Sequence, residues 1–237
     1  MAKLGVNIDH VATLREARRA PSPSPAEAAV ICERAGCDSI VCHLREDRRH
    51  IKEDDVMNLR EIVKTRLNLE MSIAKDIVDF ACKIKPDQAT LVPEKRKELT
   101  TEGGLSVKKN EGRIRTVVER LELAGIRTSL FINPVKEEID ASRRVGAGII
   151  ELHTGEYANA KSMAAKKREL KRLNAATQHA LALGLEVNAG HGLDYENTRA
   201  VARINGVNEL NIGYSIVSKA VFVGLERAVR EMLRLIR

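Results

Sequence analysis

The sequence contains no tryptophan, and only 3% of its residues are aromatic. Proteins that bind single-stranded nucleic acid stack the bases on aromatic side chains, so this chain offers few platforms for that function. It also lacks any apolar run near the roughly 20 residues that span a bilayer, which argues against a membrane protein. The first residues lack the apolar stretch and cleavage site of a signal peptide, so cytoplasmic residence is the default expectation.

Cysteine pairs with metal-binding spacing are missing as well. The four cysteines lie at positions 32, 37, 42 and 82, and none forms a Cys-x-x-Cys pair. This spacing fits no zinc finger or zinc ribbon. Since Cys42 lies in an apolar run, we expect buried, reduced thiols.

Positive charge is in excess, with 40 Lys and Arg against 33 Asp and Glu, a net charge of +7. A positive field attracts anions in general. A small phosphorylated substrate suits it without aromatic side chains, and we favour that partner over nucleic acid. The rival, a basic nucleic-acid-binding protein, rests on the run from Lys161 to Arg172, which is more simply a solvated helix face or an oligomer contact.

Short strand-like segments alternate with helical segments along the whole chain. Eight strands are expected, at 4–9, 38–43, 67–71, 88–92, 127–132, 148–153, 185–189 and 208–212. Helices are expected at 25–35, 52–66, 74–85, 112–124, 135–145, 194–203 and 216–236, with a long one ending near 183. Ser24 is the expected N-cap of the first helix and Pro25 its first residue.

This alternation predicts an α/β fold, a (β/α)8 TIM barrel formed by residues 1–237 as a single domain, because such a barrel needs roughly 200 to 250 residues. The alternative is a doubly wound open sheet, which more often has five to seven strands and a glycine-rich turn after the first. Here the first strand ends in Asn-Ile-Asp-His10 without a Gly-x-Gly motif.

Polar residues gather at the carboxyl ends of these strands, where a barrel builds its active site. They are Asn7, Asp9, His10, His43, Arg45, Glu70, Glu151, His153, Asn188, His191, Gly192, Asn211 and Gly213. Five of the six histidines lie there or just after, and only His179 falls in a helix. Histidines and buried carboxylates move protons near neutral pH. We expect a raised pKa for Glu70, which is flanked by Leu69 and Met71.

Arginines and glycines near the same ends predict anion sites. Arg18, Arg45 and His50 are candidate phosphate contacts. Gly192 and the turn after Asn211 bare backbone N–H groups at helix starts, a second phosphate seat. A metal site is disfavoured because Asp9 and His10, as strand neighbours, would point to opposite faces. No strand end carries a Schiff-base lysine, so we expect metal-free acid–base catalysis.

Eight stretches, in order over nearly the whole chain, resemble the pyridoxine 5′-phosphate synthase family. They are Gly5–Arg15, His43–His50, Asn68–Met71, Leu91–Arg96, Thr100–Gly104, Glu151–Gly155, Val187–Gly192 and Glu209–Gly213. The resemblance implies a barrel with extra helices and a homo-octamer, a tetramer of dimers. It also implies condensation of 3-amino-2-oxopropyl phosphate with 1-deoxy-D-xylulose 5-phosphate, releasing pyridoxine 5′-phosphate, inorganic phosphate and water. The resemblance further implies that no cofactor or metal is required. A barrel isomerase or aldolase acting on one sugar phosphate is the alternative enzyme.

The resemblance also assigns roles to residues. His43, Glu70 and His191 match the family's acid–base residues, and Glu151 its transition-state stabiliser. Contacts to the aminoketone phosphate match Asn7, Arg18, Gly192, Gly213 and Tyr214, and contacts to the deoxyxylulose phosphate match Asp9, His10, Arg45, His50 and Thr100. Tyr214 departs from the histidine that is common in the family, and its phenol carries no charge. The long loop 93–104 is the candidate lid over the site.

Overall fold

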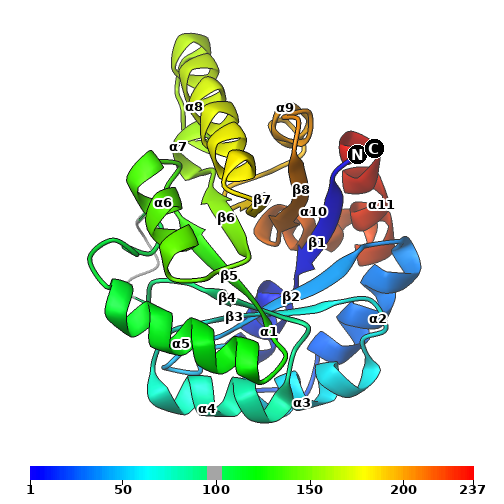
Figure 1. Ribbon diagram of the computed structural model, residues 1–237. Helices are drawn as coiled ribbons and strands as arrows, with labels where there is room; N and C mark the ends of the chain where they lie inside the picture. The colour runs from blue at the N-terminus through cyan, green and yellow to red at the C-terminus, as the bar shows by residue number, and fades with distance from the viewer. Residues whose placement is uncertain (95–102) are drawn as a thin grey trace.

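The computed structural model describes residues 1–94 and 103–237. Eight parallel strands close into a barrel in sequence order, with the helices outside it (Figure 1). The strands are β1 (Lys3–Asn7), β2 (Ser39–Leu44), β3 (Leu67–Met71), β4 (Gln88–Leu91), β5 (Arg127–Ile132), β6 (Ile149–His153), β7 (Glu186–Gly190) and β8 (Val207–Ile212). The predicted TIM barrel is confirmed.

Eleven helices occur in the described residues, so the expectation of extra helices is also confirmed. They are α1 (Asp9–Arg18), α2 (Pro25–Ala35), α3 (Glu53–Ile62), α4 (Lys75–Ile84), α5 (Glu111–Leu123), α6 (Lys136–Arg144), α7 (Gly155–Ala158), α8 (Met163–Ala182), α9 (Thr198–Ala202), α10 (Tyr214–Val223) and α11 (Leu225–Ile236). Ser24 caps α2 by accepting a hydrogen bond from the N–H of Glu27, and Gly36 ends α2 with a φ of 102°. In the part of the chain described, no helix is long and apolar enough to cross a membrane.

The first strand is shorter than predicted, and α1 was not predicted at all. β1 ends at Asn7 because the Asn7 side chain accepts a hydrogen bond from the N–H of Asp9, at 2.9 Å, and turns the chain into a helix. Asp9 and His10 therefore begin α1 and are not strand neighbours. The argument from opposite strand faces does not apply to them.

Two predicted helices were also wrong in extent. The last one divides into α10 and α11 at Gly224, whose φ of 81° breaks the helix. In the predicted 194–203 helix only Thr198–Ala202 is helical, since the Asp194 carboxylate accepts the N–H groups of Glu196 and Asn197 in a turn. A third predicted helix is also shorter, since it was expected to reach Arg66 and ends at Ile62. The bounds of β3, β5 and α2 are as predicted, and the remaining boundaries differ by one or two residues.

Apolar side chains fill the layer between the strands and the helices, and polar ones line the inner face of several strands. Asn68 precedes Glu70 by two residues and so shares its face, and Thr90 donates a hydrogen bond to Asn68 at 2.9 Å. Cys32, Cys37 and Cys42 are buried and all four cysteines are free, as predicted. Burial raises the pKa of the Cys32 thiol to about 12.

Candidate active site

The carboxyl ends of β1, β2 and β3 bring four predicted site residues into one network. Asn7 donates from Nδ2 to Asp9 at 3.0 Å and to Glu70 at 3.4 Å. Asp9 accepts the backbone N–H of His43 at 2.8 Å. One backbone N–H and one side-chain amide thus fix the carboxylate of Asp9, and the same amide of Asn7 links it to Glu70.

Glu70 and His43 are register partners on neighbouring parallel strands, so their side chains share the inner face of the barrel. Burial raises the pKa of Glu70 well above its usual range, and the charges of Glu151 and Asp9 raise it further. The predicted direction is confirmed. The raised pKa favours the protonated carboxyl group, which can donate a proton.

Glu94, which was not predicted as a site residue, contacts the ring of His43. Its carboxylate lies 3.3 Å from His43 Nε2 and accepts the N–H of Glu46 with both oxygens, at 2.9 and 3.0 Å. Burial is the largest single influence and acts to raise the pKa of Glu94, but the contact with His43, the N–H of Glu46 and the charge of Arg45 together outweigh it, and the pKa is lowered. Glu94 follows β4 by three residues, so the strand-end criterion could have found it.

Ion pairs fix the position of the segment after β2. Arg15 pairs with both oxygens of Asp55, at 2.5 and 2.8 Å, and donates to the carbonyl of His50 at 3.0 Å. Buried Arg45 lies 3.5 Å from Asp47. His50 is also buried, and its ring centroid is 6.3 Å from that of His43. The structure therefore places the ring of His50 near that of His43, and Arg45 two residues after His43.

Across the mouth, β6 and β8 hold a second carboxyl group. Glu151 is buried and accepts a hydrogen bond from Asn211 Nδ2 at 2.6 Å. Burial raises its pKa to about 7, although the bond from Asn211 acts to lower it. A side chain at Gly190 would place its Cβ 2.2 Å from Glu151 Oε1, so the carboxyl group occupies the space that this glycine leaves.

His191 lies directly after β7, and His153 lies at the end of β6. Their ring centroids are 4.9 Å apart, and Phe131 packs against His153 at 5.3 Å. Burial lowers the pKa of His153 to about 4, and partial burial also lowers the pKa of His191. Both imidazoles are neutral at pH 7.

The residues proposed to seat phosphate lie around the ends of β7, β8 and β1. Gly213 is the N-cap of α10, and a Cβ there would be 2.9 Å from that of Asn7. Tyr214 is 70% exposed, and its ring meets His10 edge-on with centroids 5.3 Å apart. Gly192 follows His191 with a φ of 77°. Gly213 thus lies beside Asn7, and Tyr214 lies beside His10.

Two predicted residues are not brought into this group. Arg18 is exposed in the last turn of α1, a ten-residue helix about 15 Å long that begins at Asp9. Within the described ranges no hydrogen bond or ion pair joins it to the other site residues. Thr100 and most of the candidate lid, 93–104, lie outside the described residues.

Among the described residues, one group could hold a metal ion. Ligand atoms of Asp9, His43 and Glu70 lie within 4.8 Å of one another. All three are otherwise engaged, because Asp9 accepts from His43 N–H, Asn7 donates to Glu70, and His43 contacts Glu94. The group therefore serves equally well as a proton-transfer network.

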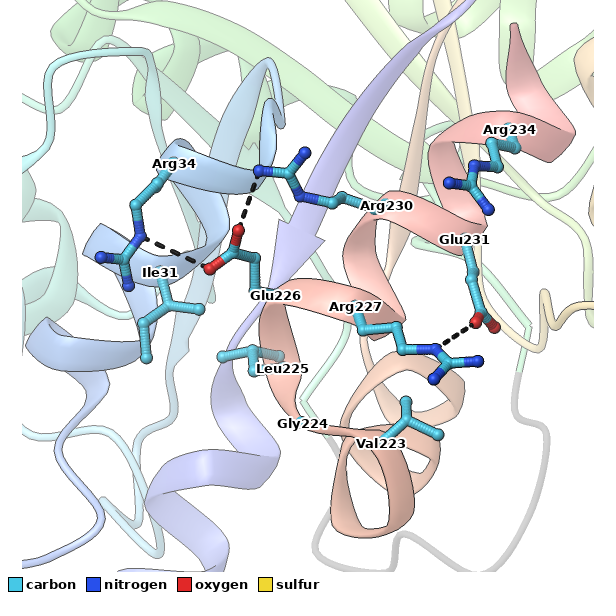
Figure 2. A pocket seen from close by; sticks show the side chains of 10 residues that line it. All are labelled: Ile31, Arg34, Val223, Gly224, Leu225, Glu226, Arg227, Arg230, Glu231 and Arg234. Carbon is cyan, nitrogen blue, oxygen red and sulfur yellow. Dashed lines mark hydrogen bonds and ion pairs between the residues drawn. The ribbon is translucent and has the colours of Figure 1, made fainter.

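A surface hollow of about 600 Å³ lies away from this mouth, between α2 and α11 (Figure 2). Arg34 reaches Glu226 across it, while Arg230 pairs with Glu226 and Arg227 with Glu231 along α11. Its four arginines outnumber its two glutamates, so the hollow keeps a net positive charge, but none of the predicted site residues lines it. The barrel mouth, where the titratable groups converge, remains the candidate active site.

A family model described as "Pyridoxal phosphate biosynthesis protein PdxJ" matches residues 4–237. The chain belongs to the PdxJ family. The resemblance found in the sequence is thereby confirmed, and the chain is an enzyme of vitamin B6 biosynthesis.

Two relatives of this PdxJ chain have the same name. The pyridoxine 5′-phosphate synthase of Synechococcus sp. (strain JA-2-3B'a(2-13)) is 58% identical over 98% of this chain and 97% of its own length. The protein of that name from Geotalea daltonii is 54% identical, covering 100% of this chain and 99% of its own. The match is thus to whole proteins.

Solved structures with little sequence similarity share the fold of this PdxJ chain. A 3-hexulose-6-phosphate synthase is 15% identical with a TM-score of 0.66, covering 99% of this chain and 100% of its own. The phosphoribosyl anthranilate isomerase of Thermus thermophilus is 12% identical with a TM-score of 0.61, covering 98% and 97%. At these identities the likeness concerns the barrel alone.

Proposed function

We propose that the chain condenses 3-amino-2-oxopropyl phosphate with 1-deoxy-D-xylulose 5-phosphate to form pyridoxine 5′-phosphate, inorganic phosphate and water. The names of its full-length relatives support this reaction. The observation that carries it is the arrangement, in one barrel mouth, of Glu70 beside His43 with Glu151 and His191 opposite, where the pKa values of both carboxyl groups are raised and that of His191 is lowered. Such a set of acids and bases suits repeated proton transfer near neutral pH.

The chemistry needs no protein nucleophile. The amine of one substrate attacks the ketone of the other, loss of water gives an imine, and phosphate leaves by elimination. Water then adds back, an aldol-type step closes the ring, and two further dehydrations make it aromatic, so that one phosphate and a net two waters are released. Each step moves protons between carbon, nitrogen and oxygen, which is the work of positioned acids and bases.

Each catalytic role follows from the protonation state of the group. The raised pKa of Glu70 favours its protonated form beside His43, and the two exchange protons with the substrate. His191 begins as a neutral imidazole, so it takes a proton before it returns one to a leaving or carbonyl oxygen. Glu151, with a pKa of about 7, stabilises positive charge when ionised.

Each phosphorylated substrate would bind at its own anion site. Asn7, Gly213 and Gly192 would hold the aminoketone phosphate through an amide and backbone N–H groups. Arg45, His50, Asp9 and His10 would hold the deoxyxylulose phosphate beside His43. Arg18, Tyr214 and Thr100 complete the proposed contacts, and their roles stay predictions.

The decisive experiment mixes the purified protein with both phosphorylated substrates and follows pyridoxine 5′-phosphate by mass spectrometry. Product should form only when both substrates are present, and equally well after dialysis against a chelator, because the proposed chemistry needs no metal. A folded preparation that forms no product would refute the proposal. Turnover of either substrate alone would favour the isomerase or aldolase alternative.

We also propose a homo-octamer, built as a tetramer of dimers. Val221 and Phe222 on α10 are 69% and 86% exposed, more than such side chains usually are on a monomer. Light scattering gives the assembly's mass, and a monomer would contradict the octamer.

The basic stretch of α8 offers less to nucleic acid than its sequence implied, because Arg172 pairs with Glu156 and Glu169.

A further inference from the structure

We propose that His153 is a positioning residue for His191, whose ring it backs and holds toward the mouth. The inference rests on the proposed function, in which His191 moves protons. His153 itself is only 4% exposed, so it is enclosed by protein and presents no open face to a substrate.

The rings of His153 and His191 pack against each other and against Phe131. Their centroids are 4.9 Å apart with an interplanar angle of 42°. Phe131 meets His153 edge-on at 5.3 Å and lies 6.3 Å from the ring of His191. The three rings thus pack against one another, and His153 and Phe131, which both lie on strands, transmit the rigidity of the barrel to His191, which lies in a loop.

The backbone of His191 needs such support. Its φ of 79° lies in the left-handed region, which is costly for a residue with a side chain. Thr154 stabilises this turn: its N–H donates to the carbonyl of Gly190 at 2.9 Å. Its hydroxyl lies 2.7 and 2.6 Å from the carbonyls of Gly190 and His191, and can donate to either one.

The space for the ring pair depends on a missing side chain. A Cβ at Gly155 would lie 2.7 Å from the ring of His153 and 3.4 Å from Cδ2 of His191. Three consecutive residues therefore shape the surroundings of His191. His153 contributes a ring, Thr154 a hydroxyl group, and Gly155 the space that a side chain would fill. A core histidine that served only to fill volume would not require this combination.

His153 acts through its shape. Its Nε2 is buried and has no hydrogen-bond partner among the described residues. Burial, the charge of His191 and the charge of Arg172 lower the pKa of His153 to about 4, so it stays neutral while the enzyme works. A neutral, enclosed imidazole holds its neighbour without competing with it for protons.

The experiment compares His153→Phe with His153→Leu in the full-length protein. Both replacements are apolar and fill the space, but only phenylalanine presents a flat face to His191. Both remove the unpartnered nitrogen, so neither should lower the melting temperature by more than a few degrees. In His153→Leu, kcat should fall at least tenfold while KM changes less than threefold, because a small misplacement of a catalytic group is costly. His153→Phe should lose less than threefold.

The ring signals of His191 provide a readout that needs no substrate. In the NMR spectrum of protein labelled at histidine, His191→Gln assigns its ring protons. Their shift, which reflects the neighbouring ring, should persist in His153→Phe and change in His153→Leu. If both His153 variants fail to fold, Gly155→Ala, which crowds the ring of His153, should displace the same signals and lower kcat.

Unchanged kcat and unchanged His191 signals in His153→Leu would overturn the inference. Equal loss of kcat in both folded His153 variants would also overturn it, because the ring nitrogens would then matter more than the ring face. Failure of the proposed function is distinguishable. If the wild type forms no pyridoxine 5′-phosphate, the NMR comparison still tests whether His153 places His191.

Discussion

Two sides of the barrel mouth use the same types of residue in opposite ways. On the β1–β3 side, His43 faces the carboxylate of Glu94, and Asp9 accepts the backbone N–H of His43. On the β6–β8 side, His191 packs on His153, and neither imidazole has a carboxylate partner among the described residues. One histidine has an acidic partner and the other has an aromatic one.

The difference shows how one barrel can both hold charge and suppress it. Around the first histidine, hydrogen bonds lower the pKa of Glu94 despite its burial. Across the mouth, burial raises the pKa of Glu151 and lowers those of His153 and His191, so their neutral forms prevail. Binding a charged sugar phosphate suits the first side, and proton transfer to neutral intermediates suits the second. Glu70 connects the sides, since Glu151 and Asp9 both raise its pKa.

The largest effect is expected for Glu70→Gln, which removes the acid that links the two sides. Turnover should slow by about 10² or more while substrate binding changes little, as is typical when a general acid or base is lost. Steady-state kinetics gives kcat and KM, and exposed Glu196→Gln is the matched control. Wild-type turnover would remove Glu70 from the proton path.

Glu151→Gln should make the protein more stable at high pH. The pKa of Glu151 is about 7 in the folded protein and near 4.5 unfolded, so the folded state binds more protons between these values. The wild type therefore loses stability as pH rises from 4.5 through 7, on the order of 3 kcal/mol at about 1.4 kcal/mol per pKa unit.

Denaturant unfolding at pH 5 and pH 8 measures this effect. Glu151→Gln should lose less stability between the two pH values than the wild type, while its turnover falls because the stabilising carboxylate is gone. An identical pH dependence in the two proteins would mean that Glu151 titrates normally, and that the β6–β8 side does not suppress its charge.

A smaller effect is expected for Glu94→Gln on the β1–β3 side. The amide keeps one acceptor for the N–H of Glu46 but loses the charged contact with His43. A charge-assisted hydrogen bond contributes about 1.5–3 kcal/mol, and partial replacement should lower kcat about tenfold. Glu46→Gln, an exposed change in the same region, is the matched control for the assay. Equal activity in both variants would leave His43 without a functional partner in Glu94.

The smallest effect is expected for Tyr214→Phe, at the seam between the two sides. The ring of Tyr214 meets His10, and the side chain is 70% exposed. If Gly213 and Tyr214 hold phosphate through backbone N–H groups, removal of the phenol should raise KM for the aminoketone by less than about threefold. A tenfold rise would instead assign the phosphate contact to the hydroxyl.

Much of the fold and site was predictable because strand ends carry a strong signal. His43, Glu70, Glu151 and His191 each follow a short apolar run, and parallel strands bring their ends together. The raised pKa of Glu70 was predicted in direction, but its causes include Glu151, which is 81 residues away in the sequence.

The misses have local or long-range causes. Helix α1 was missed because a single side-chain bond from Asn7 redirects the chain, and short polar segments carry little periodicity. Glu94 was overlooked because its partner, His43, lies 51 residues earlier. The contact of His153 with His191 depends on the register of β6 with β7, which pairs His153 with Gly190 and is invisible in the sequence.

The register of the strands also sets where this enzyme tolerates insertions and deletions. His43 and Glu70 are opposite each other on β2 and β3, and the residue before each one, Cys42 or Leu69, faces the helices. A one-residue insertion within either strand would exchange the two faces, so that a thiol or a leucine would replace a proton-transfer group. Insertions should survive at the opposite, amino-terminal ends of the strands, and a library scanned for growth without vitamin B6 would map that boundary.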